Sequence, residues 1–245
     1  MSTLCSLACS KPDLLDLCDV KTIPRKVGAK QTANLFPMLW RFLPTLDPEV
    51  SVVMSRDLDS RFTEREAAAV REWLESNRSL HAMRDHPWHG VPIMGGGWGA
   101  KLDTQQRRDN WKLTWDKMLS DSRLYSGSDK KGPDQDLLHK YVWKTWGQGD
   151  SLHHDSYTCN RFPGSTGWPT QRINTTDHNF FGAVGEPAFY STQRSSMFFL
   201  GGKYGRVSLH SYMYINSVCL GAVYFMKVCP VNCRREGHRD NWIYC

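Results

Sequence analysis

The chain has 245 residues, of which 40% are hydrophobic and 12% aromatic, and its formal net charge is +6. This length allows one large domain or two small ones, and because no run of 18 apolar residues occurs, no membrane-spanning helix is expected. The positive charge is spread out, without a basic helix, zinc-finger spacing or aromatic RNA-binding motif. This pattern argues against nucleic-acid binding and suits a solvated surface or an anionic substrate such as a nucleotide diphosphate.

The first residues and the cysteines bear on the cellular compartment. The start, MSTLCSLACSKPD, lacks the basic region and apolar run of a signal peptide, so the protein is cytoplasmic or a leader is missing. No CxxC pair occurs among the eight cysteines, which argues against a zinc ribbon. Cys229, Cys233 and Cys245 can staple a C-terminal tail in an oxidising compartment, and the sequons at Asn77 and Asn174 point to the secretory pathway and the Golgi lumen.

In chain order, strands are predicted to alternate with helices, which is typical of an α/β layer architecture. Residues 1–12 are expected to be unstructured. The predicted elements are strand 14–20, helix 31–43, strand 51–55, a helix from Thr63, strand 80–83, helix 104–119 and helix 134–146. Thr63 and Glu66 fit a capping box. After residue 147 the pattern becomes irregular and rich in Gly, Pro, Ser and aromatic residues.

The predicted strand 51–55 runs into Asp57 and Asp59. Residues i and i+2 of a strand point the same way, so both carboxylates can reach one cation. Hard ions such as Mn²⁺ or Mg²⁺ accept carboxylate, water and phosphate oxygens, and open α/β sheets bind ligands beyond the carboxyl ends of their strands. The alternative is a polar turn before a helix.

Three further segments combine polar residues with glycine or aromatic residues. In residues 83–99, Arg84, Asp85, His86 and His89 precede a glycine run and Trp98, whose ring can stack on a sugar, although a tight aromatic turn is the simpler explanation. His86 and His89 lack the HExxH context of a zinc site.

The second and third segments each contain an aspartate beside another polar residue. Asp134 and Gln135 open a predicted helix, where Asp134 either caps the helix or accepts hydrogen bonds from hydroxyl groups. His154 and Asp155 lie in a predicted loop and are either a late metal or phosphate ligand or ordinary surface residues.

These segments, in this order, resemble the GT-A type of nucleotide-sugar glycosyltransferases. The match covers about residues 14–172 and is similar to a little-characterised glycosyltransferase family with an RDxDS motif. It rests on Arg56-Asp57-Leu58-Asp59-Ser60, Arg84-Asp85-His86, Gly-Gly-Gly-Trp-Gly at 95–99, Asp134-Gln135 and the segment around His154.

The resemblance implies a metal-dependent transfer of a sugar from a UDP- or GDP-linked donor to an unknown glycan, protein or lipid acceptor. It assigns the roles as follows: Asp57, Asp59 and His154 hold Mn²⁺ or Mg²⁺; Arg56, Arg84 and His86 bind the substrate; Gly95, Gly96 and Trp98 shape the sugar and acceptor pocket; Asp85, Asp134 and Gln135 act at the catalytic centre. The Asp134-Gln135 pair is typical of enzymes that retain the anomeric configuration.

The implied fold is a Rossmann-like mixed sheet with helices on both faces. It places a GT-A-like catalytic domain at residues 13–172 and a loop-rich extension with a Cys-rich tail, packed on the same domain, at residues 173–245. Only 56 residues precede Asp57, so the nucleotide-binding unit is expected to be shortened.

Two other functions fit the same residues. One is a metal-dependent phosphoesterase that uses the acidic residues together with His86, His89, His153 and His154. The other is a glycosyltransferase-like binding module without activity, because its amino-terminal unit is incomplete.

Overall fold

The structure is a computed structural model, and it describes residues 36–57, 60–121, 132–147, 149–172, 180–183 and 228–244. The expected unstructured segment 1–12 and the predicted strand 14–20 lie outside these residues. So does most of the predicted loop-rich extension 173–245, of which residues 180–183 and 228–244 are described.

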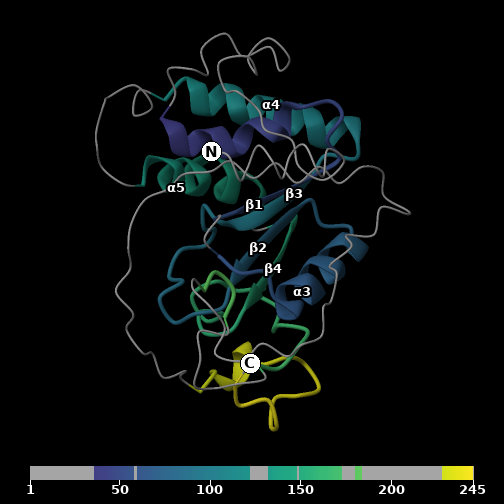
Figure 1. The fold of residues 1–245 in the computed structure, drawn as a ribbon, viewed down its shortest axis with the longest axis vertical. Helices are drawn as coiled ribbons and strands as arrows, with labels where there is room; N and C mark the ends of the chain where they lie inside the picture. Colours follow the sequence, from purple (N-terminus) through teal and green to yellow (C-terminus); the bar gives the residue numbers. More distant parts are fainter. Residues whose placement is uncertain are drawn as a thin grey trace, which may run out of the picture.

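A mixed sheet of four strands forms the centre of the described residues (Figure 1). Its strands are β1 (Val52–Arg56), β2 (Leu80–Arg84), β3 (Gly97–Lys101) and β4 (Ser151–Asp155), in the spatial order β1-β3-β2-β4. β3 is antiparallel to β1 and β2, and β4 is parallel to β2. β1, β2 and β4 therefore run in the same direction and end at the same edge of the sheet.

Alternation of side chains along β1 explains why helices cover both faces of the sheet. Val53 packs with the larger core cluster on one face, whereas Val52 packs with Val70 and Trp73 of α3 (Glu64–Glu75) on the other. The predicted α/β architecture with helices on both faces is thus present in the described residues. Thr63 is the N-cap of α3, as predicted, and accepts the Glu66 backbone N–H at 3.1 Å.

Four helical segments cover the face opposite α3 (Figure 1). They are the 3₁₀ helix η2 (Pro37–Leu46), α4 (Gln105–Leu119), α5 (Pro133–Leu137) and the π-helix η4 (Leu138–Gly147) that continues α5. The predicted helix 104–119 matches α4, and the predicted helix 134–146 is divided between α5 and η4. Pro37 is the first residue of η2, where its missing N–H costs no hydrogen bond.

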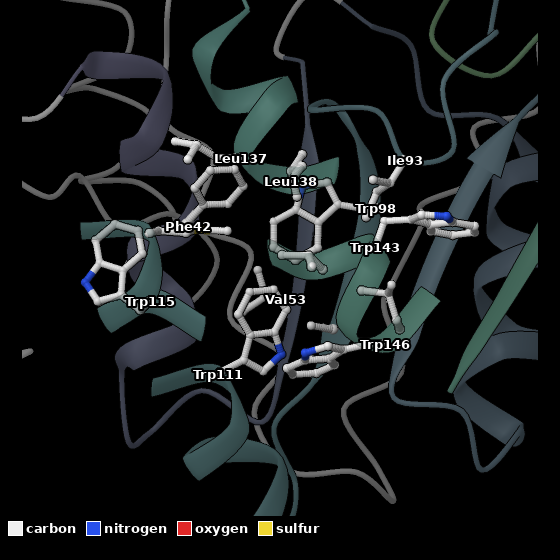
Figure 2. Close-up of a cluster of buried hydrophobic side chains, with 14 of the residues drawn as sticks. Phe42, Val53, Ile93, Trp98, Trp111, Trp115, Leu137, Leu138, Trp143 and Trp146 are labelled. Atoms are coloured by element: carbon white, nitrogen blue, oxygen red, sulfur yellow. The ribbon is translucent and has the colours of Figure 1, made fainter. Parts of the chain in front are cut away.

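Aromatic side chains fill the space between these helices and the sheet (Figure 2). The ring of Trp98 in β3 stacks on the ring of Trp111 in α4, with 5.4 Å between their centroids. The centroid of Phe42 lies 5.5 Å from that of Trp98. Trp98 and Phe42 have no exposed surface, and Trp111 is 1% exposed. Burial of a large aromatic ring contributes roughly 2–3 kcal/mol each, so this cluster anchors the sheet to its helical layer.

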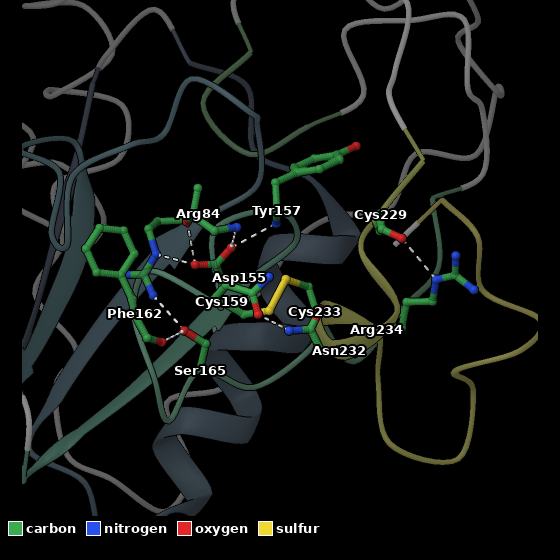
Figure 3. The surroundings of a disulfide bond; sticks show 12 residues. Arg84, Asp155, Tyr157, Cys159, Phe162, Ser165, Cys229, Asn232, Cys233 and Arg234 are labelled. Atoms are coloured by element: carbon green, nitrogen blue, oxygen red, sulfur yellow. Dashed lines mark hydrogen bonds and ion pairs between the residues drawn. A yellow bond between two sulfur atoms is a disulfide. The ribbon is translucent and has the colours of Figure 1, made fainter.

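A disulfide between Cys159 and Cys233 connects the C-terminal segment 228–244 to the turn that follows β4 (Figure 3). Arg235 of the same segment bonds both carboxylate oxygens of Glu72 on α3, at 2.9 and 3.0 Å. The sequence suggested that Cys229, Cys233 and Cys245 staple the tail. The structure joins Cys233 to Cys159, 74 residues earlier, and Cys229 is disulfide-bonded as well, whereas Cys245 lies outside the described residues. This bond is compatible with an oxidising compartment.

In the part of the chain that the structure describes, no helix combines the length and the apolar character needed to cross a bilayer.

Candidate functional site

The shared edge of the sheet carries an aspartate at the end of each of its three parallel strands. Asp57 follows β1, Asp85 follows β2, and Asp155 is the last residue of β4. Gly95 and Gly96 lie at the same edge, immediately before β3 begins. Ligands of open α/β sheets bind at such an edge, and the three aspartates there differ in their exposure and in their partners.

Asp57 is the open one of the three. Its side chain is 52% exposed, and Oδ1 accepts a hydrogen bond from Nη1 of Arg41 at 3.3 Å. Arg41 belongs to η2, and its own side chain is 16% exposed. This is a long and solvated ion pair, which contributes at most about 1 kcal/mol to stability.

Asp134 lies near Arg41 and is buried, with 2% of its surface exposed. Burial raises the pKa of its carboxyl group; Arg41 and the local backbone amides oppose that rise, and Asp57 adds to it. Its Oδ1 atom is buried and has no hydrogen-bond partner among the residues that the structure describes. An unpartnered buried carboxylate oxygen is costly, so Asp134 Oδ1 is a candidate acceptor for a ligand at this edge of the sheet.

Gly95 and Gly96 let the loop before β3 approach these carboxylates closely. A Cβ atom added to Gly95 would lie 2.9 Å from Asp134 Oδ2 and 3.0 Å from Arg41 Nη1. A Cβ atom added to Gly96 would overlap the Asp57 carboxylate. The two glycines therefore form a wall of backbone against which Arg41, Asp57 and Asp134 converge.

Gln135 and Ser55 hold this wall in place. Gln135 Oε1 accepts the Gly95 N–H at 3.0 Å, and its Nε2 donates to the carbonyl of Ile93. Ser55 Oγ donates to the carbonyl of Gly95 at 2.6 Å. Gln135, which the sequence places at the catalytic centre, thus acts here by positioning the glycine loop.

The chemical type of the oxygen atoms at this edge fits a hard divalent cation. Asp57 and Asp134 supply carboxylate oxygens, one of them unpartnered, and Mn²⁺ or Mg²⁺ takes its remaining ligands from water or phosphate. Asp59, the second predicted acid, lies outside the described residues, and among the residues that are described no three His, Cys, Asp or Glu side chains gather as a ligand group.

Asp85 is sealed, in contrast to Asp57. It has no exposed surface, forms ion pairs with Arg65 at 2.9 Å and Arg172 at 2.5 Å, and accepts hydrogen bonds from Ser156 Oγ and the Phe181 N–H. Its pKa is lowered because the two guanidinium groups outweigh the effect of burial. The predicted catalytic role does not suit this position; Asp85 instead joins four segments of the chain.

Arg84 and Asp155 form a second sealed pair. Arg84 Nε donates to Asp155 Oδ2 at 2.6 Å, and both side chains are at most 1% exposed. Arg84 Nη2 also donates to His153 Nδ1 at 2.6 Å (Figure 3 shows the surroundings of Arg84). Arg84 was predicted to bind substrate; its donors are directed to partners inside the protein instead.

Arg56 and Trp98 also point into the interior. Arg56 lies 2.8 Å from Glu66 and stacks over Phe181, with 4.3 Å from its guanidinium carbon to the ring centroid. Burial raises the pKa of Glu66 to about 7, and Arg56 opposes the rise. Arg56 Nη1 donates a hydrogen bond to the carbonyl of Gly96 at 3.4 Å and thereby helps to hold the glycine loop. Trp98, predicted to line a sugar pocket, lies in the core instead.

His86 and His89 pack beside each other at the end of β2. His86 is 8% exposed, and its ring lies 4.6 Å from that of Phe180. Nδ1 of His86 accepts the Trp88 N–H at 3.2 Å, and Nδ1 of His89 accepts the Asp85 N–H at 2.9 Å. A neutral ring that accepts at Nδ1 carries its proton on Nε2, so these tautomers are set for hydrogen bonding and not for zinc.

His154 lies away from Asp57, on the face of the sheet that α3 covers. It has no exposed surface; Nε2 is 3.3 Å from Glu72 Oε2, and Nδ1 is 2.9 Å from Nε2 of His81. Since a carboxylate only accepts hydrogen bonds, Nε2 of His154 donates and Nδ1 accepts from His81. Arg41 and Asp57 meet on the opposite face, so the structure does not bring the predicted third ligand to the predicted metal site.

Comparisons with models of known families, with curated proteins and with solved structures gave no match.

Of the predicted site residues, the structure therefore brings together Asp57, Asp134, Gln135, Gly95 and Gly96. It also adds Arg41, which the sequence reasoning missed. A signal was available: Arg41 is the one charged residue in the ten-residue segment PMLWRFLPTL, and a charge within an otherwise apolar helix is expected to have a partner.

Proposed function

We propose that this protein is a metal-dependent glycosyltransferase of GT-A type, which transfers a sugar from a UDP- or GDP-sugar with retention of configuration. The proposal rests on one observation: half-exposed Asp57 and buried Asp134, whose Oδ1 lacks a partner, converge beside Gly95 and Gly96 at the carboxyl edge of a mixed α/β sheet. The ordered sequence motifs support it. The disulfide fits a secretory compartment such as the Golgi lumen.

Each residue of this site has a proposed task. Asp57, assisted by Asp134, would hold Mn²⁺ or Mg²⁺, and the bound metal would supply Lewis-acid stabilisation of the charge on a leaving diphosphate. The Gly95–Gly96 wall lets a sugar ring approach the Asp57 and Asp134 carboxylates closely, because no glycine side chain stands in the way. Asp134, whose pKa is raised by burial, can accept a hydrogen bond from a sugar hydroxyl through its Oδ1 atom.

A non-catalytic binding module is the second candidate, and one observation favours it. Arg41 already supplies a positive charge to Asp57, so the site can bind sugar hydroxyls through an Arg and two carboxylates without a metal. The phosphoesterase reading loses support, because His153 and His154 are bound to Arg84 and Glu72 on opposite faces of the sheet.

Nucleotide release from a panel of UDP- and GDP-sugars, measured with and without Mn²⁺, tests the proposal. We expect release by the wild type, loss of at least about 100-fold in Asp57→Asn and Asp134→Asn, and full activity in the control Asp103→Asn, whose side chain is similarly exposed at 48%. Binding of a donor without release in any condition would favour the binding module. Unchanged release by Asp57→Asn would refute the metal role of that residue.

A further inference from the structure

Arg41 occupies the position at which a cation would be expected in the candidate site. Its guanidinium contacts Asp57 Oδ1 at 3.3 Å and lies next to Asp134, since both Arg41 Nη1 and Asp134 Oδ2 would be within 3.0 Å of a Cβ atom at Gly95. Its charge also lowers the pKa of Asp134, against the larger effect of burial. One positive charge therefore contacts Asp57 directly and lies near the carboxylate of Asp134.

This arrangement leaves the site incompletely satisfied. Arg41 makes no ion pair with Asp134 within 4.0 Å among the described contacts, and Oδ1 of Asp134 has no hydrogen-bond partner. A guanidinium keeps its charge at every physiological pH. It can therefore give up the carboxylates only by moving, and not by losing a proton.

The Arg41–Asp57 pair has the properties of an exchangeable contact. The sealed Arg84–Asp155 pair has a 2.6 Å contact and side chains 1% and 0% exposed, whereas Arg41 and Asp57 are 3.3 Å apart and 16% and 52% exposed. An exposed pair of this kind gives at most about 1 kcal/mol. A divalent cation that binds carboxylates directly competes well with it.

We infer that Arg41 is a built-in counter-ion that holds the place of the divalent cation and must be displaced when the metal binds. This inference rests on the proposed function. It gives the site a resting state in which Asp57 is neutralised, and it makes Arg41 a competitor of the metal, so that the affinity for Mn²⁺ is lower than two carboxylates would otherwise provide. After displacement, the guanidinium is available to an anionic group that arrives with the metal.

Titration of the full-length protein with Mn²⁺, followed by the electron-paramagnetic-resonance signal of free Mn²⁺, tests the inference without any measurement of turnover. The variant Arg41→Met keeps the side-chain stem and removes the charge. We expect it to bind Mn²⁺ about fivefold more tightly than the wild type, which corresponds to ~1 kcal/mol. The double variant Arg41→Met/Asp57→Asn should lose this gain.

Arg107→Met is a matched control. Arg107 pairs with Asp103 on α4, and the two side chains are 20% and 48% exposed, close to the 16% and 52% of Arg41 and Asp57. Because both variants change the net charge equally, a gain of affinity in Arg107→Met as well would show a general charge effect and overturn the inference.

The outcomes separate the two proposals. If the wild type binds Mn²⁺ and Arg41→Met binds it equally or less tightly, the competition is refuted while the metal site remains. If neither protein binds Mn²⁺, although both keep the wild-type circular-dichroism spectrum, the proposed metal-dependent function fails together with the inference. A gain that persists in the double variant would place the Mn²⁺ elsewhere and also overturn it.

Discussion

The same dipeptide, Arg-Asp, stands at the ends of β1 and β2, but the two aspartates lie in opposite environments. Arg56-Asp57 stands at the end of β1 and Arg84-Asp85 at the end of β2. The two strands are parallel to each other and end at the same edge of the sheet. At the end of β2, Asp85 is fully buried between Arg65 and Arg172. At the end of β1, Asp57 is half exposed and shares Arg41 with a second carboxylate.

The difference shows what separates a structural acid from a candidate ligand. Both aspartates occupy the edge where α/β sheets bind ligands, so position alone does not distinguish them. The number of partners does: four side chains or backbone groups saturate Asp85, whereas Asp57 has one long contact. The buried ion pairs are therefore at the ends of β2 and β4, and the exposed carboxylate is at the end of β1.

The largest effect is expected from the sealed end. Asp85→Asn removes the buried carboxylate with which both Arg65 and Arg172 pair, and breaking a buried ion pair from one side costs about 3–5 kcal/mol. Urea unfolding followed by circular dichroism measures the loss. The exposed α4 substitution Asp116→Asn should change stability by less than about 0.5 kcal/mol. A loss below about 1 kcal/mol in Asp85→Asn would contradict the structural role.

The disulfide that fastens the C-terminal segment near the sealed end should give the next largest effect. Replacing Cys159 and Cys233 together by Ala removes a link across 74 residues and should lower the free energy of unfolding by about 2–4 kcal/mol. Unfolding of the oxidised wild type and of the double variant under the same buffer conditions provides the comparison. Equal midpoints would mean that the segment is held without the bond.

Acid should weaken the sealed end by about 1.4 kcal/mol per pH unit for each proton taken up on unfolding. Burial lowers the pKa of His89 to about 4 and of His153 to about 3, from 6.5. The unfolded chain therefore binds protons below pH 6.5 that the folded protein does not, so stability is complete above pH 6.5 and falls as pH falls. Glu66 acts in the opposite sense, because its raised pKa of about 7 makes its contribution fall as pH rises from 4.5.

The histidines outnumber Glu66, so the net effect between pH 7 and pH 4.5 should be a loss of stability on acidification. Urea midpoints across this range measure it. In His153→Gln, whose amide oxygen can still accept from Arg84, the slope should be smaller by about one proton. A pH-independent midpoint in the wild type would contradict the neutral state of the buried rings.

The smallest effect on stability is expected at the open end. Asp57→Asn removes one solvated ion pair and should change the free energy of unfolding by less than about 1 kcal/mol, while it abolishes Mn²⁺ binding. Thermal unfolding with and without Mn²⁺ measures both properties in one experiment, because a ligand that binds only the folded state raises the midpoint. A large loss of stability in this variant would remove the contrast between the two ends.

Sequence pattern was sufficient where one periodicity dominates. The apolar, β-branched run of β1, the capped start of α3 at Thr63 and the extent of α4 are all as predicted. The sequence predicted loops at β3 and β4, and the structure shows strands. β3 consists of GWGAK, whose small residues suggest a turn, yet Gly97 leaves room for the ring of Phe181, far along the chain. β4 is rich in polar residues because His153, His154 and Asp155 have partners inside the protein.

The site was predictable in part. The sequence indicated Asp57, Asp134, Gly95 and Gly96 by their residue types and by their positions next to predicted elements, and those positions bring them to one edge of the sheet. Whether an acid at that edge is free or saturated depends on arginines from other segments, such as Arg172 for Asp85 and Arg41 for Asp57. Such pairings between distant segments leave no periodic trace in a single sequence.

The late position of the C-terminal segment in the chain has a consequence for biosynthesis. Arg235 contacts Glu72, Cys233 bonds to Cys159, and the Tyr244 carbonyl accepts the N–H of Arg172, which itself holds Asp85. A ribosome makes these residues after the whole sheet. Until they emerge, α3 and the loop after β4 present unmatched charges and an unpaired thiol to the surrounding folding machinery, so maturation has to wait for translation of residues 228–244.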